Sequence, residues 1–324
     1  MYWRVVVSSS GRKHAAILTL LLLAAALGLS QLVTRAESGS DNPAQAVVAA
    51  MQARDAKTTS LGSNCELETQ EFSDAVLEAR RDPDLGPVVP RQVWTGRFVF
   101  DGDRFYEEQQ CTYPESSAGK LTWRAFDGRL GRHYDAASGI GAEVAPEKMS
   151  DSAAGGSQVG AWLYLAHDVK PGEPTESNLV VKSEAVLKDP EVTLDGLRCY
   201  LLKATKQTDK GNYERRWWVA PERDWAVVKF EGITRFPWDD LIASRGLTRH
   251  VESWAEVNGV WMPTVVTHRI EVTLTDGRTV LLKGDKLTMT YQSVNTSLPL
   301  TTFQPTFPTG MLVAGRAETY VAGK

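Results

Sequence analysis

The sequence predicts an α+β fold: one large curved antiparallel sheet of about eleven strands, with a few helices packed on it. From Trp94 onward, apolar residues recur at every second position, as in "GRFVFDGDRFYEE" (96–108). No long helical pattern separates consecutive strand candidates, which disfavours the parallel βαβ arrangement with its crossover helices. Both observations indicate a meander of hairpins.

Hairpin turns are marked by five Asp-Gly or Asn-Gly pairs that lie between apolar runs. A type I′ turn needs a positive φ at both central residues, which Gly adopts freely and Asn or Asp tolerate. The pairs therefore predict corners of the sheet, not binding sites: Asp101-Gly102, Asp127-Gly128, Asp195-Gly196, Asn258-Gly259 and Asp276-Gly277.

The N-terminal segment 1–36 has the anatomy of a secretory signal peptide. A cationic stretch, 12–14, precedes the apolar run 15–29, and cleavage is predicted after Ala36. The run is short for a membrane span, which needs about 20 residues. An uncleaved N-terminal membrane anchor is the alternative. In either case we expect residues 37–324 to be exported as one domain.

Few segments read as helical. Residues 40–58 predict a helix that Asp41 or Asn42 caps and that Pro43 opens at its first position. A second helix is predicted over 71–82, although 65–72 equally fits a strand.

Two further segments lack strand periodicity. Residues 137–160 are rich in Gly, Ala and Ser and predict a mobile loop, within a flexible insertion near 137–178. Residues 236–246, with Pro237 near their start, predict a short helix or lid over an opening of the sheet.

Three cysteines in an exported chain predict a disulfide, because disulfides persist outside the cytoplasm. We expect Cys65 to pair with Cys111, with Cys199 buried and free. The alternative is that all three are small buried hydrophobic residues.

Several functional classes are disfavoured. The net charge of −4 offers no basic footprint for nucleic acid. No HExxH, GxSxG or phosphate-loop pattern occurs, so we expect no enzyme, no metal site and no cofactor. A hydrolase that uses Asp127 and His133 is the least favoured alternative.

Aromatic residues are the more informative signal, with ten tryptophans in the chain. In "RRWWVA" (215–220) and "WAVVKFEG" (225–232), apolar residues occupy both alternations, so both faces of these strands are expected to be covered. Helices can cover one face. The other needs a second layer of protein or an apolar ligand in a concavity, while plain core packing remains an alternative.

The order of motifs along residues 42–324 resembles the LolA-like superfamily of bacterial envelope proteins. This superfamily includes lipoprotein-sorting carriers, the N-terminal domain of the sigma-E regulator RseB, and mycobacterial lipid-binding lipoproteins. The motifs that carry the resemblance are "WRAFDGRLGRHYD" (123–135), "VTLDGLRCYLL" (192–202), "WAEVNGVWMPT" (254–264) and "LPLTTFQPTFPTGMLVAG" (298–315).

The resemblance implies an unclosed half-barrel of about eleven antiparallel strands, with helices across the concave side and an inner cavity that binds acyl chains. The expected partner is thus a lipid or the acyl chains of a lipoprotein. The alternative is a protein-interaction or stress-sensor module of the RseB type, with an envelope protein as partner. Membrane contact is expected only at the N-terminal segment or peripherally. The predicted ligand-binding residues are Trp94, Phe98, Phe100, Trp123, Trp218, Phe230 and Trp254, with Trp238 and Leu241 in the lid.

Overall fold

The computed structural model describes residues 43–72, 74, 91–115, 119, 121–145, 176–209, 211–315 and 318–323. The predicted signal peptide (1–36), much of the predicted second helix and most of the insertion fall outside these residues. None of the helices in the described ranges is long and apolar enough to cross a membrane.

The first half of the chain contributes six strands. These are β1 (Ser60–Glu71), β2 (Arg91–Asp101), β3 (Arg104–Tyr113), β4 (Leu121–Phe126), β5 (Gly131–Asp135) and β6 (Ile140–Val144). The segment 65–72 is thus a strand almost to its end. β6 lies inside the segment 137–160 that was expected to be a loop.

The second half contributes nine strands. These are β7 (Val186–Leu194), β8 (Leu197–Thr208), β9 (Gly211–Ala220), β10 (Ala226–Arg235), β11 (Ile242–Val257), β12 (Val260–Leu274), β13 (Thr279–Val294), β14 (Leu312–Ala314) and β15 (Thr319–Val321). The predicted number of about eleven strands is therefore wrong: the described residues form fifteen. Strands of three to five residues, such as β5, β6, β14 and β15, are too short to show a period-two pattern in the sequence.

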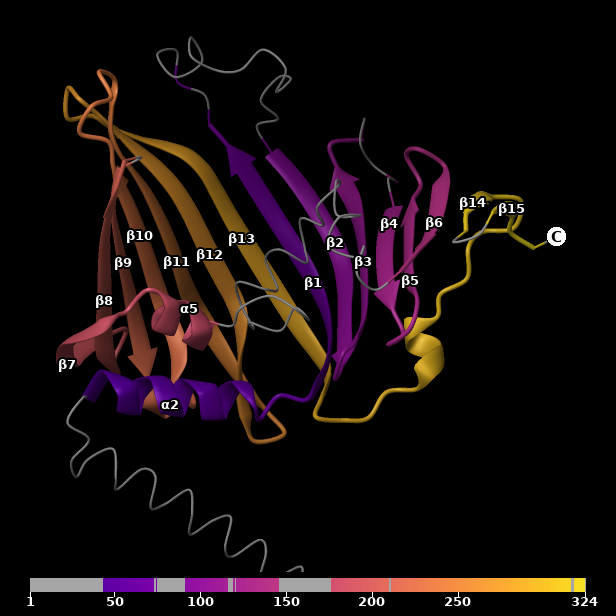
Figure 1. The fold of residues 1–324 in the computed structure, drawn as a ribbon, viewed down its shortest axis with the longest axis horizontal. Coiled ribbons are helices and arrows are strands. Elements are labelled where there is room, and N and C mark those ends of the chain that lie inside the picture. The colour runs from indigo at the N-terminus through magenta and orange to yellow at the C-terminus, as the bar shows by residue number, and fades with distance from the viewer. Residues whose placement is uncertain are drawn as a thin grey trace, which may run out of the picture.

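All these strands form one unclosed sheet, in the order β15-β14-β6-β5-β4-β3-β2-β1-β13-β12-β11-β10-β9-β8-β7 (Figure 1). Neighbouring strands are antiparallel except β14, which runs parallel to β6. β1 lies in the middle, where it pairs with β2 on one side and with β13 on the other. It thereby joins a meander of the first half to a meander of the second half.

The five predicted corners are all turns, but of more than one type. Both turn residues have positive φ only at Asp195-Gly196 and Asn258-Gly259, as a type I′ turn requires. At the other three pairs only the glycine has positive φ. The prediction of corners is confirmed, and the glycine of every pair has positive φ.

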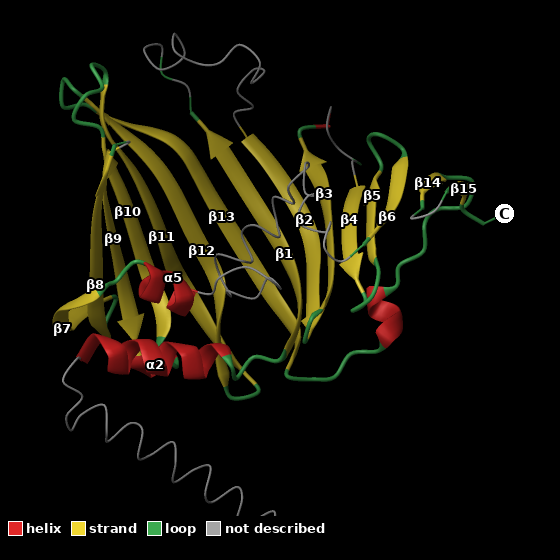
Figure 2. Cartoon of the chain, viewed as in Figure 1, coloured by secondary structure: helices red, strands yellow, loops and turns green. Residues whose placement is uncertain are grey.

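Two helices lie against one face of the sheet, near the ends of β8 and β9: α2 (Pro43–Asp55) and α5 (Glu176–Lys182) (Figure 2). Buried α2 residues Ala44, Val47 and Met51 pack in one cluster with α5 and with the strand residues Leu202 and Trp217. This face is called the helix face below, and the opposite face is called the outer face. Coverage of the whole concave side by helices stays a prediction.

The short helix predicted for 236–246 is wrong. Residues 236–241 form the turn between β10 and β11, in which Asp239 Oδ1 accepts hydrogen bonds from the backbone N–H groups of Leu241 and Ile242. Thr275 of the β12–β13 turn donates its backbone N–H to Leu241 O at 2.9 Å. Both turns lie at the end of the sheet opposite α2 (Figure 1).

The predicted Cys65–Cys111 disulfide is also wrong, since all three cysteines are free and buried. Cys65 lies on β1 and Cys111 on β3, and β2 runs between them. Strands two places apart are separated by about 10 Å, whereas a disulfide joins Cα atoms about 4.4–6.8 Å apart.

We expect these thiols to react slowly with Ellman's reagent in the native protein at about pH 8, because the thiolate is the reactive form. Burial raises the pKa of Cys65 to about 12, with a further contribution from Glu107, and burial raises the pKa of Cys199 to about 11. Unfolding in denaturant without reductant serves as the control and should release three thiols per chain. Release of a single thiol would contradict the structure.

Candidate functional site

The helix face carries an apolar row that crosses five adjacent strands. Val251 (β11) lies opposite Val266 (β12), which lies opposite Leu287 (β13); next come Leu67 (β1) and Trp94 (β2). Residues directly opposite one another in antiparallel strands project to the same face. The first four of these side chains are buried, and Trp94 packs against them. Apolar residues nearer α2 extend the row into a cluster that includes Leu61, Phe98, Phe100, Met262 and Met289.

A charged row follows two residues further along the same strands, about 7 Å away. Arg249 lies opposite His268, His268 opposite Asp285, and Asp285 opposite Thr69, and all four are buried. His268 Nδ1 and Asp285 Oδ2 are 3.1 Å apart, and Lys283 Nζ lies 3.7 Å from Asp285 Oδ1. Burying a charged group costs desolvation free energy unless the group is paired. This row therefore destabilises the fold unless its ion pairs offset that cost.

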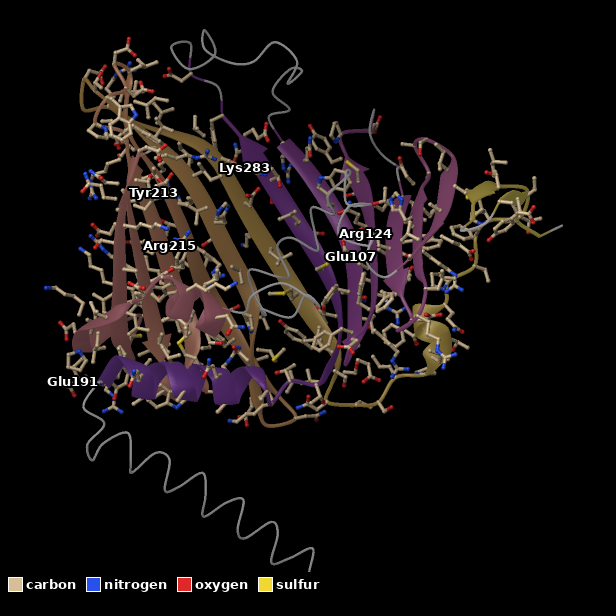
Figure 3. The ribbon with its side chains drawn as sticks, in the orientation of Figure 1. Glu107, Arg124, Glu191, Tyr213, Arg215 and Lys283 are labelled. Atoms are coloured by element: carbon tan, nitrogen blue, oxygen red, sulfur yellow. The ribbon has the colours of Figure 1, made fainter. Side chains whose placement is uncertain are left out.

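A second buried ion pair lies on the same face, on β3 and β4 (Figure 3). Glu107 lies opposite Phe98 in the register, which places its side chain on the helix face. Arg124 Nη2 donates to Glu107 Oε2 at 3.0 Å and to Oε1 at 3.2 Å. The helix face therefore combines an apolar part near α2 with charged groups further along β11, β12 and β13, and with an ion pair beside the apolar part on β3 and β4.

The structure groups some of the predicted ligand-binding residues on this face. Phe98 and Phe100 belong to the apolar cluster, with ring centroids 6.1 Å apart, and Trp94 and Trp254 pack against it. Phe230 also lies on the helix face, opposite Trp217 and Arg249. Four of these residues, Trp94, Phe98, Phe100 and Phe230, project from the helix face, whereas Trp254 lies opposite Pro263 and also packs against the outer-face cluster of Trp218 and Cys199.

The remaining predicted residues lie elsewhere. Trp123 packs on the outer face with Val99 and Phe303, and Trp218 packs there with Cys199 and Val228. Trp218 and Trp217 are both buried, on opposite faces, so the prediction that both faces of this strand are covered is confirmed. Trp238 is 58% exposed in the turn between β10 and β11, and Leu241 lies in the same turn. One concave face therefore does not bring all nine residues together.

Asp127, named in the hydrolase alternative, lies in the turn between β4 and β5. The Asp127 carboxylate accepts backbone hydrogen bonds from Arg129 and Leu130 and a hydrogen bond from Gln304 Nε2 at 2.9 Å. Burial acts to raise the pKa of Asp127, but these hydrogen bonds and the charge of Arg132 outweigh it, so the pKa is lowered. Asp127 thus fixes a turn and the C-terminal segment. Within the described ranges, no three His, Cys, Asp or Glu residues gather as metal ligands would.

Sequence reasoning missed the charged row. Its members Arg249, His268 and Asp285 are far apart in the chain and belong to no motif. One signal was available in the sequence: an ionisable residue at a position whose neighbours two residues away are apolar, as at His268 between Val266 and Ile270. Only the pairing register shows that three such positions are neighbours.

No protein-family model matches the sequence, and no curated protein matches it. Among solved structures, a DUF1329 family protein from Desulfovibrio piger is similar with 13% identity and a TM-score of 0.44, over 81% of this chain and 97% of that chain. A domain assigned to outer membrane lipoprotein sorting, from Vibrio parahaemolyticus, is similar with 11% identity and a TM-score of 0.41, over 80% and 97%.

The complex of MucA and MucB from Pseudomonas aeruginosa is similar with 8% identity and a TM-score of 0.24, over 80% of this chain and 95% of that chain. At TM-scores this low, these structures carry no inference about the function of this chain.

Proposed function

We propose that the protein is an exported, non-enzymatic protein that binds an apolar ligand, a lipid or the acyl chains of a lipoprotein, along the helix face of its sheet. The observation that supports this is the apolar row from Val251 to Trp94. In the part of the chain that the structure describes, α2 and α5 pack over β8 and β9, beside this row. Four of the side chains in this row are already buried in the structure, so an acyl chain would take the place of what covers them, and its extended shape matches a row of side chains.

The expected affinity follows from the burial of methylene groups. Each CH₂ removed from water contributes about 0.8 kcal/mol, so a chain of about 16 carbons supplies micromolar binding after the entropic cost of association. Export is supported by the N-terminal sequence, with its cationic stretch and apolar run (12–29).

The test uses a matched pair of substitutions at neighbouring positions on opposite faces of β12. Val266→Thr keeps the shape of a buried side chain but adds a hydroxyl to the apolar row, at a cost of about 1–3 kcal/mol. We expect it to weaken binding of a fluorescent fatty acid about ten-fold. Thr267→Val, on the outer face, should leave the affinity unchanged, with displacement by unlabelled palmitate as the measurement.

The proposal fails if the unmodified protein neither displaces the probe nor retains lipid in native mass spectrometry after purification without detergent. Equal effects of the two substitutions would mean that the ligand binds away from the apolar row.

If the protein binds no lipid at all, a protein-interaction module is the remaining candidate. One observation favours it: Ile140 of β6 and Leu312 of β14 lie opposite each other and are 52% and 57% exposed.

A further inference from the structure

We propose that a groove between α5 and the ends of β8 and β9 binds the anionic headgroup, a phosphate or a carboxylate, of an amphiphile whose apolar chain lies on the helix face. This inference rests on the proposed function and deepens it, because it assigns the chemical class of the ligand. The groove has a volume of about 620 Å³. It is lined on the α5 side by Lys182 and Ser183, and on the sheet side by Ala204, Lys206, Tyr213 and Arg215.

The strand side of the groove belongs to the helix face. Arg215 lies opposite Ala204, and Ala204 is part of the buried cluster around α2. Arg215 also precedes Trp217 by two positions, so the two side chains project from the same face of β9. Figure 3 shows Tyr213 and Arg215 together on this part of the sheet. The groove thus lies on the face of the sheet that also carries the apolar row from Val251 to Trp94.

The charge of the groove favours an anion. Its lining holds three cations, Lys182, Lys206 and Arg215, and two carboxylates, Glu184 and Asp209. Arg245 adds a further positive charge from β11, because it lies opposite Thr234, which itself lies opposite Tyr213. Positive charges around a partly enclosed space attract a phosphate or a carboxylate and raise its local concentration.

Arg215 has the geometry to recognise such a group. Its Nη1 donates to Ser183 Oγ at 3.1 Å, which holds the guanidinium toward α5. A guanidinium carries five N–H donors in a planar fork, so one bond to a hydroxyl orients the fork for two parallel bonds to an oxyanion. Tyr213 adds a phenolic hydroxyl to the same lining.

On the outer face of the same strands, the cationic side chains are paired with a carboxylate of the protein. There Glu214 Oε1 lies 3.2 Å from Lys203 Nζ and also contacts Arg216, while its Oε2 lies 3.4 Å from Arg235 Nη1. Burial acts to raise the pKa of Glu214, but hydrogen bonds with Arg216 and Lys203 lower it overall. A buried carboxylate therefore holds the outer cations, whereas Arg215 on the helix face is held by a neutral serine.

The C-terminal end of α5 borders the groove, and exposed helix carbonyls there would oppose an anion. These carbonyls already accept backbone hydrogen bonds: Leu179 O from Ser183, Val180 O from Ala185 and Val181 O from Glu184. The carbonyl dipoles at the end of α5 are thus already hydrogen-bonded, and the ammonium of Lys182 is the charged group that this end offers to an anion.

The experiment compares two amphiphiles that share one palmitoyl-glycerol body and differ in the phosphate: lysophosphatidate and monopalmitoylglycerol. Their affinities are measured by displacement of a fluorescent fatty acid from the full chain. In the double variant Lys206→Gln and Arg215→Gln, we expect the affinity for lysophosphatidate to fall about ten-fold or more, the scale of a charge-assisted hydrogen bond. The affinity for monopalmitoylglycerol should stay within about two-fold.

The control is the double variant Arg269→Gln and Lys286→Gln, which removes two exposed charges from the outer face of β12 and β13. It should change neither affinity. A further arm uses inorganic phosphate alone. If phosphate binds as tightly as lysophosphatidate, the groove takes a free anion and the headgroup assignment is overturned.

The two levels of the proposal fail differently. If both amphiphiles bind the unmodified protein equally well, or if the groove variant weakens both alike, the headgroup inference is overturned while apolar binding stands. If neither amphiphile binds, the proposed function fails and this inference falls with it.

Discussion

Replacing Trp217 by alanine is expected to lower the free energy of unfolding by about 3–5 kcal/mol, the range for a large aromatic side chain deleted from a core. Trp217 is fully buried on the helix face and belongs to the cluster that joins α2 and α5 to β8 and β9. Its ring centroid lies 5.5 Å from that of Phe230. Deletion would leave a cavity between helices and sheet. Urea unfolding followed by far-UV circular dichroism measures the change.

Trp238→Ala is the matched control for this substitution. Trp238 is 58% exposed in the turn between β10 and β11, so its loss should change the free energy of unfolding by no more than about 0.5 kcal/mol. A loss below about 1 kcal/mol for Trp217→Ala would contradict the packing of α2 and α5 on the sheet.

The second large effect is expected at the buried Glu107–Arg124 pair. Their side chains are only 4% and 9% exposed, so Arg124→Met would leave the Glu107 carboxylate without its nearest counter-charge in a poorly solvated site. Removal of one partner of a buried ion pair costs about 3–5 kcal/mol. The double variant Glu107→Leu and Arg124→Met should recover most of this loss, because neither of the two positions then carries a buried charge. A double-mutant cycle in urea gives both values.

The exposed pair Glu68–Arg91 provides the comparison. Its side chains are 43% and 54% exposed at an Nε to Oε1 distance of 2.7 Å, so Arg91→Met should cost less than about 1 kcal/mol. If Arg124→Met costs no more than Arg91→Met, the Glu107–Arg124 pair is more solvated than the structure shows.

Local features of the fold could be predicted from the sequence. The alternation of apolar residues around Phe98 and Phe100 indicates a strand. Asn258-Gly259 has the positive φ angles of a tight turn. Pro43 suits the first turn of α2. Each depends on a few consecutive residues. The parallel pairing of β14 with β6 could not be predicted, because three-residue strands carry no period and their partner lies far away in the chain.

The sequence predicts that the site is apolar, but it does not predict which residues lie on the same face of the sheet. Aromatic residues on strands indicated an apolar surface, but their face depends on alternation and on bulges that no motif marks. Trp217 and Trp218 are neighbours in the sequence and lie on opposite faces. The Cys65–Cys111 disulfide failed for a related reason: both residues are buried on strands of the first half, and the intervening β2 decides their distance.

The central position of β1 has a consequence for how the chain reaches its native state. β1 pairs with β13, and beside that pair the backbone N–H of Thr59 donates to Asn295 Oδ1, 236 residues later in the sequence. Contacts between residues so far apart in the sequence raise the contact order and slow folding. The chain loses the entropy of closing a long loop before these contacts can stabilise it. A nascent chain holds β1 with one edge unpaired until nearly all of the sequence has been synthesised. The apolar row across β13 and β1 is therefore among the last features to be completed, and it is exposed to aggregation until then.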